Sequence, residues 1–503
     1  MALAAKLKSW SEELTPYFIY LLFVATLGPL LFGYHLAELN APQEVITCTK
    51  KSLTSSESSS TSLPQCIPMD STQLGLVSSI FTLGGFLGAL ASGSLAARYG
   101  RLLVMRVNTV LLVLGPLGET FAPNITVLAL GRLVSGLGAG VSVVVVPIYI
   151  SEIAPPKEKG FFGAFTQIAT NVGIFTTQVL GYFLSHGQMW RVILAVAGVI
   201  GVGQFLGLLF AVDSPKWQAD HADPQQAKSN LRRIRGHGAD ISEEVEGWRS
   251  ANLNDANDEE QTLLSPDENS NNNNSTATTS PSSSNPSRTN VSILGVLLDP
   301  RHNRAILAVV VVMMAQQLCG INSIIMYGVS LLADLLASNS ALLNIFVSVL
   351  NVVATTAFAP LADVLGRKAC ILASIAGMGA SSVLLAVGIR SAIPVLSAVS
   401  VLLFVGSFAF GLGPVPFILS SELVGPEAVG ATQSWALAAN WISTFVVAQF
   451  FPMVNERLGK GVVYFVFAGL AGVFFVFVSW YVPETKGKKD ADEVWGRTSR
   501  RED

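Results

Sequence analysis

Residues 193–212 read ILAVAGVIGVGQFLGLLFAV, twenty consecutive positions without a charged side chain. A run of about 20 apolar residues is long enough to cross the hydrocarbon core of a bilayer as an α-helix. A second run, YFIYLLFVATLGPLLFGYHLA, occupies residues 17–37. Half of the 503 residues are hydrophobic and only 13% are charged, against about a quarter in an average soluble domain. The chain is therefore predicted to lie in a membrane.

Runs of this kind recur along the whole chain. They predict twelve membrane-spanning helices, at residues 17–37, 74–96, 103–121, 127–149, 162–184, 192–212, 305–331, 341–362, 369–388, 393–421, 431–453 and 461–482. With an even number of spans both termini lie on one side, here called the terminal face; the other side is the loop face. Of the 31 Lys and Arg residues, 24 fall on the terminal face and 6 on the loop face. The positive-inside rule therefore predicts a multi-pass protein with both termini in the cytosol.

The four cysteines divide between two settings. Cys48 and Cys66 share the one long loop of the loop face, where an oxidising environment is expected. We predict a disulfide between them. Cys319 and Cys370 lie in or beside spans and are interpreted as packing residues.

The two halves of the chain repeat each other. Gly-Arg at 100–101 follows the second span and recurs at 366–367 after the eighth; Ser-Glu at 151–152 follows the fourth and recurs at 421–422 after the tenth. The surrounding sequences agree, GLGAGVSVVVVPIYISEIAPP with GLGPVPFILSSELVGPE. Six helices per repeat give both copies one orientation, the parallel-repeat architecture of secondary transporters, with a substrate site between the halves.

This repeat predicts the domain organisation. An N-terminal six-helix bundle at 1–212 precedes a cytosolic linker at 213–303 with short helices, a second bundle occupies 304–482, and a cytosolic tail occupies 483–503. Within the linker, residues 267–287 read DENSNNNNSTATTSPSSSNPS, a composition that cannot bury apolar area and predicts disorder.

The linker also contains a sorting signal of the E-x-x-x-L-L type, formed by Glu259, Leu263 and Leu264. It is similar to signals that direct membrane proteins to lysosomes or vacuoles. We therefore expect a sorting adaptor as a partner and favour a vacuolar or lysosomal membrane over the plasma membrane, although such a motif also arises by chance in acidic linkers.

Nine motifs occur in a fixed order: FGYHLAELNAP, RYGRL, GRLVSGLGAG, VPIYISEIAPPKEKG, QQLCGIN, LADVLGRK, GLGPVP, NW and VPETKGK. With these the chain resembles the sugar-porter branch of the major facilitator superfamily, which includes facilitative glucose transporters and proton–sugar symporters. The likeness covers both halves and leaves out only residues 41–70 and 250–292. It implies an all-α membrane protein of twelve helices that carries a hexose-like sugar by alternating access. No cofactor, metal, nucleic acid or second protomer is expected.

The motif QQLCGIN places Gln316, Gln317 and Asn322 within an apolar span. Along a continuous helix, Gln316 and Gln317 would lie about 240° and 140° from Asn322, so the group would cover a broad face. Buried amides need partners, so they face either a wet cavity or each other. They could bond helices together, or bind sugar hydroxyls, which also donate and accept. We favour sugar binding.

The resemblance implies the further sugar-contacting residues. They are amides on both halves and two aromatic side chains: Gln167, Gln178, Gln316, Gln317, Asn322, Asn351, Asn440, Phe417 and Trp441. An aromatic ring can stack on the apolar face of a pyranose. Phe417 stands where many glucose transporters have Trp and has no N–H to donate, so strict glucose selectivity is not implied. Tyr327 is a gate residue by analogy or a packing residue.

A set of charged residues marks the terminal ends of the spans: Arg101, Glu152, Asp363, Arg367 and Glu422. They are either solvated surface charges or, as in the family, charges that lock the halves together when the cytosolic side is closed. The first half has Ala97 in place of Asp363, which predicts an asymmetric lock.

His35 departs from the family, whose proton-coupled members have Asp here and whose facilitative members usually have an uncharged residue. A histidine could titrate near physiological pH or serve as a hydrogen-bonding pore residue. With Glu38 expected at a helix end, and Glu152 and Glu422 at the rim, the sequence predicts no other acid in the membrane core. We therefore favour facilitative over proton-coupled transport. A sugar sensor on a transporter fold and a carrier of another small polyol-like metabolite are the alternatives; an enzyme is not expected.

Overall fold

The computed structural model describes residues 15–49, 63–221, 223–236, 240–242, 244–246, 299–336, 339–358, 364–425, 428–488 and 491–496. Helices dominate these residues. The first half contains α2 (Pro16–Ala37), α4 (Ser71–Tyr99), α5 (Arg101–Thr120), α6 (Ile125–Ile153), α7 (Lys159–Leu184) and α8 (Trp190–Leu209). The second half contains α13 (Asn303–Leu318), α14 (Ile321–Leu336), α15 (Asn339–Phe358), α17 (Arg367–Arg390), α18 (Pro394–Phe410), α19 (Val415–Glu422), α20 (Val429–Leu458) and α21 (Val463–Tyr481).

Eleven of the spans expected from the sequence are long and apolar enough to cross a bilayer within the described residues. The remaining expected span, 162–184, lies in α7, which is a helix of 26 residues. Its amide and hydroxyl side chains, among them Gln167, Asn171 and Gln178, lower its hydropathy below that of the other spans. A helix of this polarity is expected to face protein or water rather than lipid.

Two spans that the sequence predicts as continuous helices are broken. The span expected at 305–331 divides into α13 and α14 at Gly320, whose φ of +99° is a left-handed conformation that glycine adopts without strain. The span expected at 393–421 divides into α18 and α19 across Gly411–Pro414, because proline cannot continue the hydrogen-bonding pattern of a helix. The angular positions expected for Gln316, Gln317 and Asn322 assumed a continuous helix and therefore do not apply across Gly320.

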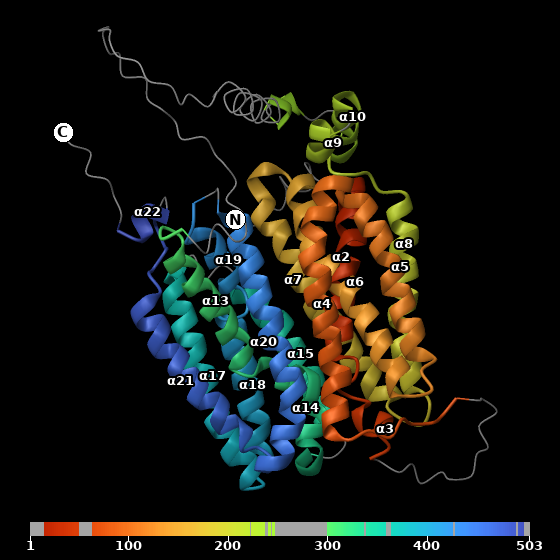
Figure 1. Cartoon of the computed structure of the whole chain (residues 1–503), viewed down its shortest axis with the longest axis vertical. Helices are drawn as coiled ribbons and strands as arrows, with labels where there is room; N and C mark the ends of the chain where they lie inside the picture. The colour runs from red at the N-terminus through yellow and green to blue at the C-terminus, as the bar shows by residue number, and fades with distance from the viewer. Residues whose placement is uncertain are drawn as a thin grey trace, which may run out of the picture.

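The two halves form bundles that stand side by side (Figure 1). In the figure the first half runs from red to yellow-green and the second from green to blue. They pack against each other chiefly through α4 with α20 and through α7 with α15. These pairs take corresponding positions in the two repeats, which gives the interface an approximate twofold arrangement.

The repeat extends to the carboxylates that cap two helices on the terminal face. Oδ1 of Asp213, which follows α8, accepts from the backbone N–H groups of Arg101 and Leu102 at 3.1 Å. Glu484, which follows α21, accepts from the N–H groups of Arg367 and Lys368 at 2.8 and 3.2 Å. A carboxylate stabilises the positive end of a helix dipole. Burial raises the pKa of Asp213, and these backbone N–H groups oppose that rise.

The linker leaves the first half through two short helices, α9 (Pro215–His221) and α10 (Pro224–Arg235), at the top of Figure 1. Arg235 donates to the carbonyls of Ile153 and Ala154 at 2.6 and 2.9 Å and pairs with Glu244. It thereby ties α10 to the end of α6. The Asn/Ser-rich segment and the sorting signal of Glu259, Leu263 and Leu264 lie outside the described residues.

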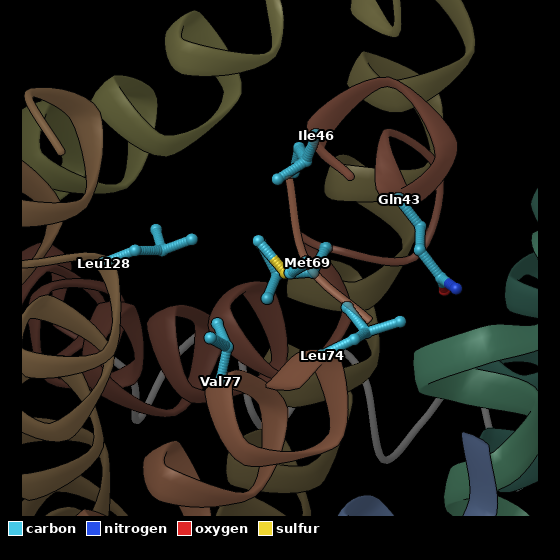
Figure 2. A pocket seen from close by; sticks show the side chains of 7 residues that line it. Gln43, Ile46, Met69, Leu74, Val77 and Leu128 are labelled. Carbon is cyan, nitrogen blue, oxygen red and sulfur yellow. The ribbon is translucent and has the colours of Figure 1, made fainter. Parts of the chain in front are cut away.

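On the loop face, Cys48 and Cys66 form the disulfide that the sequence predicts, with their Cα atoms 5.4 Å apart. The short helix α3 (Gln43–Ile46) precedes it. Trp190 donates from its ring nitrogen to the carbonyl of Gln65 at 2.9 Å, which holds the loop against α8. Ile46 of α3, Val77 of α4 and Leu128 of α6 line the same apolar pocket (Figure 2).

We expect replacement of both cysteines, Cys48→Ser with Cys66→Ser, to lower the free energy of unfolding by about 3 kcal/mol, because the bridge closes a loop of 18 residues. Thermal unfolding in detergent, with and without a reducing agent, measures this change. The reductant should destabilise the natural protein and leave the double variant unchanged. Complete alkylation of both cysteines without reduction would contradict the disulfide.

Candidate functional site

Four of the predicted amides meet in the second half where α13 is broken from α14. Asn322 donates to Oε1 of Gln317 at 2.7 Å, and Gln317 donates to Oε1 of Gln316 at 3.2 Å. Asn440 of α20 donates to the same Gln316 oxygen at 2.5 Å. The amides therefore form one connected chain across α13, α14 and α20.

Gln316 also donates hydrogen bonds to the backbone where the neighbouring span is broken between α18 and α19. Its Nε2 donates to the carbonyls of Leu412 and Gly413 at 2.7 and 2.9 Å, which lie between α18 and α19 and have no helical partner. Gln316 thus has a structural role in addition to any contact with a ligand. Gln317 and Asn322 bond mainly to each other and can exchange those bonds for bonds to a hydroxylated ligand.

A row of aromatic rings leads from this site into the first half. Trp441 follows Asn440 on α20 and is 4% exposed. Its ring lies edge-on to that of Phe32, at 5.7 Å between centroids, and Phe32 stacks on Phe81 at 6.4 Å. A Cβ atom at Gly85 of α4 would lie only 2.3 Å from the Trp441 ring, so the indole rests directly on the glycine backbone.

The predicted residues Gln167 and Asn351 meet at the contact between α7 and α15. Gln167, whose side chain is exposed, donates to Oδ1 of Asn171 at 3.2 Å. Asn351 donates to the same oxygen at 3.4 Å, and Asn171 donates to Thr355 at 3.3 Å. Asn171 is thus a polar residue at the centre of the interface that the sequence analysis missed, although its spacing of four from Gln167 on one helix could have indicated it.

Three other predicted residues do not join these groups. Gln178 is buried, and its Oε1 has no hydrogen-bond partner among the described residues. Phe417 on α19 is 42% exposed. Tyr327 donates to the carbonyl of Ala448 at 2.6 Å and stacks on Phe451 at 5.4 Å. Both partners belong to α20 in its own half, but Tyr327 also interacts with the side chain of Ser78 on α4 in the other half. It therefore contacts both halves.

The charged residues of the terminal face pair within each half. Arg101 binds Glu152 through two bonds of 2.9 and 2.7 Å, and Arg367 binds Glu422 at 2.8–3.1 Å. Asp363 lies outside the described residues. Since each ion pair is internal to one bundle, neither of the two joins the halves in this conformation.

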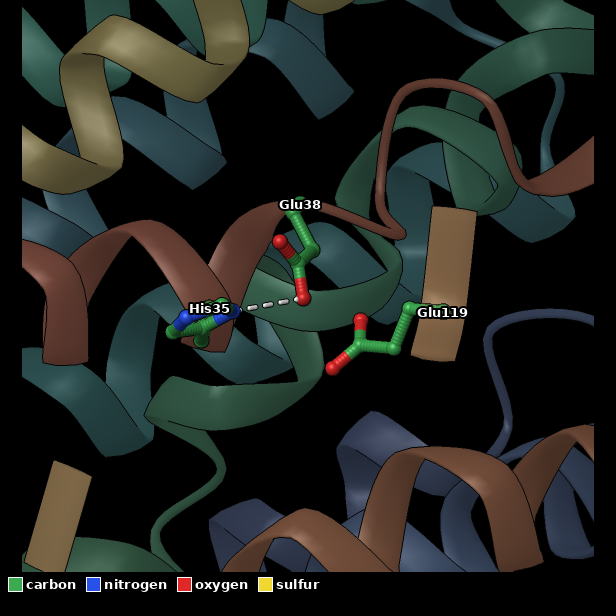
Figure 3. Close-up of side chains that lie close together, drawn as sticks. All are labelled: His35, Glu38 and Glu119. Atoms are coloured by element: carbon green, nitrogen blue, oxygen red, sulfur yellow. Dashed lines mark hydrogen bonds and ion pairs between the residues drawn. The ribbon is translucent and has the colours of Figure 1, made fainter. Parts of the chain in front are cut away.

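The first half holds a second polar group, which the sequence did not predict. Glu38 lies at the end of α2, as expected, but it is buried, at 1% exposed. Glu119 of α5 is 0% exposed, so the expectation that no other acid lies in the membrane core is wrong. Glu38 binds both Nδ1 of His35, at 2.9 Å, and the guanidinium of Arg132. Ser135 donates to Glu119 at 2.5 Å. Figure 3 shows the Glu119 carboxylate turned toward Glu38.

One nitrogen or oxygen atom each of His35, Glu38 and Glu119 lies within 4.8 Å of those of the other two. This spacing alone would suit a metal ion. Arg132, however, already binds Glu38 and its positive charge would repel a cation placed beside it. We therefore do not assign the group to a metal.

Comparison with known proteins agrees with the fold and the motifs. A family model described as "Sugar (and other) transporter" matches residues 21–494. The chain belongs to this family. A probable metabolite transport protein of Saccharomyces cerevisiae is 32% identical over 94% of this chain and 93% of its own length. Vacuolar protein sorting-associated protein 73 of the same yeast is 30% identical over 94% of this chain and 95% of its own length. The facilitated glucose transporter member 2 of the pig is 29% identical over 95% of this chain and 93% of its own length.

Among solved structures, the transporter superposes on the inward-open xylose transporter of Escherichia coli with a TM-score of 0.74 at 21% identity. The match covers 96% of this chain and 100% of that one. Together with the family match, this likeness shows the fold of the major facilitator superfamily, with its two six-helix halves.

Within the transporter, the halves are bonded together at the loop face. Asn40 donates to the carbonyl of Ile325 at 2.8 Å and accepts from the N–H of Val329 at 2.9 Å. Ser71 of α4 also bonds Glu456 of α20. A cavity of about 670 Å³ lies beside these contacts, lined by Asn40, Glu44 and residues of α7, α14 and α15. The described cross-half hydrogen bonds lie at the loop face and mid-depth.

We expect Gly85→Ala to destabilise the transporter by about 1–3 kcal/mol, the usual cost of overpacking, because the added methyl group must displace Trp441. Gly93→Ala is the matched control, since it changes the same helix at a position with no atom within 4 Å of the new Cβ. Thermal unfolding of both purified variants measures the difference. Equal stability of the two would show that the Trp441 ring moves aside freely.

Proposed function

We propose that the transporter carries a hexose-like sugar across its membrane by alternating access. The observation that carries this proposal is the connected group of amides formed by Gln316, Gln317, Asn322 and Asn440 at a helix break. Trp441 follows Asn440 on α20. Amides donate and accept hydrogen bonds as sugar hydroxyls require, and an indole offers a flat apolar face to a pyranose ring. The names of the pig and bacterial relatives, a glucose (hexose) and a xylose (pentose) transporter, support a monosaccharide as the substrate.

The proposed sugar ligands are those the sequence analysis selected. In the second half, Gln317 and Asn322 bond to each other. Asn440 and Trp441 lie beside each other in the sequence of α20. Gln167 and Asn351 would contact the sugar from the interface. Gln316 is expected to position the others because both protons of its amide group are used by backbone carbonyls. Gln178 and Phe417 would take part only after a rearrangement, and Phe417 leaves room for polyols other than glucose.

The two halves supply the moving parts of such a cycle. Asn40 closes the loop face by bonding to α14, while the ion pairs of Arg101 and Arg367 stay within their own bundles. We propose that this is the conformation open toward the terminal face, and that the excess of Lys and Arg places that face in the cytosol. Opening the loop face would require these cross-half bonds to break.

A vacuolar or lysosomal membrane remains the proposed location. The sorting signal at Glu259, Leu263 and Leu264 and the yeast relative named for vacuolar protein sorting both support it. We further propose that the protein works as a monomer without a cofactor and is not an enzyme. The preference for facilitative transport depended on His35 replacing the acid of proton-coupled relatives and on the expected absence of another acid from the membrane core. The burial of Glu38 and Glu119 removes the second argument and leaves the first.

We expect Gln317→Ala and Asn322→Ala each to weaken sugar affinity roughly 5- to 150-fold, because a lost hydrogen bond in a dry site costs about 1–3 kcal/mol. Uptake of labelled hexoses into proteoliposomes over a range of concentrations measures the change. Gln433→Ala, an exposed glutamine on α20, is the control and should behave like the natural protein. Unchanged affinity together with a lower melting temperature in the first two variants would mean that these amides only bond helices together.

A further inference from the structure

Asn171, near the middle of α7, belongs to a closed ring of hydrogen bonds with two side chains of α15. Its Nδ2 donates to Oγ1 of Thr355 at 3.3 Å, and Thr355 donates to Oδ1 of Asn351 at 3.3 Å. Asn351 closes the ring by donating to Oδ1 of Asn171 at 3.4 Å. Because the bond to Thr355 fixes the orientation of the Asn171 amide, its oxygen faces the N–H donors around it.

The oxygen of Asn171 has both of its acceptor positions occupied in this conformation. A side-chain amide oxygen has two lone pairs. Nε2 of Gln167 donates to Oδ1 at 3.2 Å and Nδ2 of Asn351 at 3.4 Å. Both distances exceed the usual N···O separation of about 2.9–3.0 Å, so these bonds are weaker than average. Gln167 and Asn351 can therefore exchange Asn171 for another partner at low cost.

Binding of a sugar at this interface would change the bonding of Asn171. Gln167 is exposed and lies one helical turn before Asn171, so a ligand that reaches Gln167 lies next to Asn171. A ligand that takes the N–H groups of Gln167 and Asn351 removes both donors from the Asn171 oxygen. Asn171 is only 2% exposed, and a buried acceptor without a donor is unfavourable. The ligand must therefore supply a donor of its own.

A hydroxyl group has the hydrogen-bonding capacity that this position requires, because it offers one donor and two acceptor lone pairs. Its oxygen can accept from Gln167 and from Asn351 while its hydrogen donates to Asn171. An ether oxygen or a fluorine atom would accept but could not donate, and a methylene group would do neither. The three side chains thus distinguish a hydroxyl group from groups of similar size.

We propose that Asn171 is a specificity-determining residue, which accepts a hydrogen bond from one hydroxyl group of the sugar while Gln167 and Asn351 donate to that same group. This inference rests on the proposed function as a sugar carrier. The hydroxyl takes the place of the direct bond from Asn351 to Asn171, which joins the two halves. It then bridges α7 and α15 itself, so recognition of the sugar and the contact between the halves occur at one point.

The test replaces the hydroxyl groups of the sugar one at a time. Full-length protein in proteoliposomes takes up labelled glucose, and the competitors are glucose itself and its analogues in which a single hydroxyl is replaced by fluorine or by hydrogen. Fluorine removes the donor and keeps an acceptor. At one carbon atom, the fluoro analogue should bind roughly 5- to 150-fold more weakly than glucose, the range for a hydrogen bond left unmade in a buried site.

The variant Asn171→Leu removes the acceptor with little change in side-chain volume. The penalty for that one fluoro analogue should disappear, whereas the penalties at the other carbon atoms should remain. Asn171→Ala, which removes the acceptor without a branched side chain, should give the same pattern. Thr176→Val is the matched control on α7, because the Thr176 hydroxyl donates to the carbonyl of Val172 in its own helix. It should keep every penalty of the natural protein.

A purely structural role for Asn171 gives a different result. Weaker binding of glucose and all analogues by the same factor, together with a lower melting temperature, would overturn the proposal, because Asn171 would then only hold α7 against α15. Unchanged penalties in both variants, with hexose uptake intact, would also overturn it and leave the sugar carrier standing. Failure of the natural protein to take up any hexose would overturn the proposed function and this inference together.

Discussion

Polar groups inside a membrane protein must be paired within the protein, because the surrounding lipid offers no hydrogen bonds. Gln316 shows how this constraint organises the second half. Its amide nitrogen binds Leu412 and Gly413, the carbonyls left free where α18 gives way to α19, and its oxygen accepts from Gln317 and Asn440. One side chain therefore stabilises one helix break while it orients amides at another. The amides of the candidate sugar site are therefore held in place by the same hydrogen bonds that the backbone carbonyls at the helix break require.

The sequence was sufficient for features that depend on local composition. Runs of apolar residues located the spans, and the repeated Gly-Arg and Ser-Glu pairs revealed the two halves, whose copies form equivalent ion pairs. The cysteine pair was predicted from its shared loop. All of these follow from residues that are neighbours in the chain or that recur at matching positions in each repeat.

The buried acid pair could not be predicted in this way. Glu38 and Glu119 are 81 positions apart in the sequence, and both lie at the ends of apolar runs, where a charged residue is usually solvated. Only the packing of α2, α5 and α6 shows that the two acids share one dry space with Arg132. Similarly, hydropathy cannot reveal the break at Gly320, since both helical pieces are apolar and only the left-handed backbone marks it.

The contact between Trp441 and Gly85 has a mechanical consequence. A flat ring that rests on bare backbone is held by dispersion forces, which are individually weak and do not favour one direction. Nearer the loop face, by contrast, hydrogen bonds from Ser71 to Glu456 and from Ser79 to Gln449 hold α4 and α20 in one register. The two bundles could therefore rotate relative to each other about the contact between Trp441 and Gly85. A side chain at position 85 of α4 would hinder this rotation. The glycine there therefore influences how fast the molecule changes conformation.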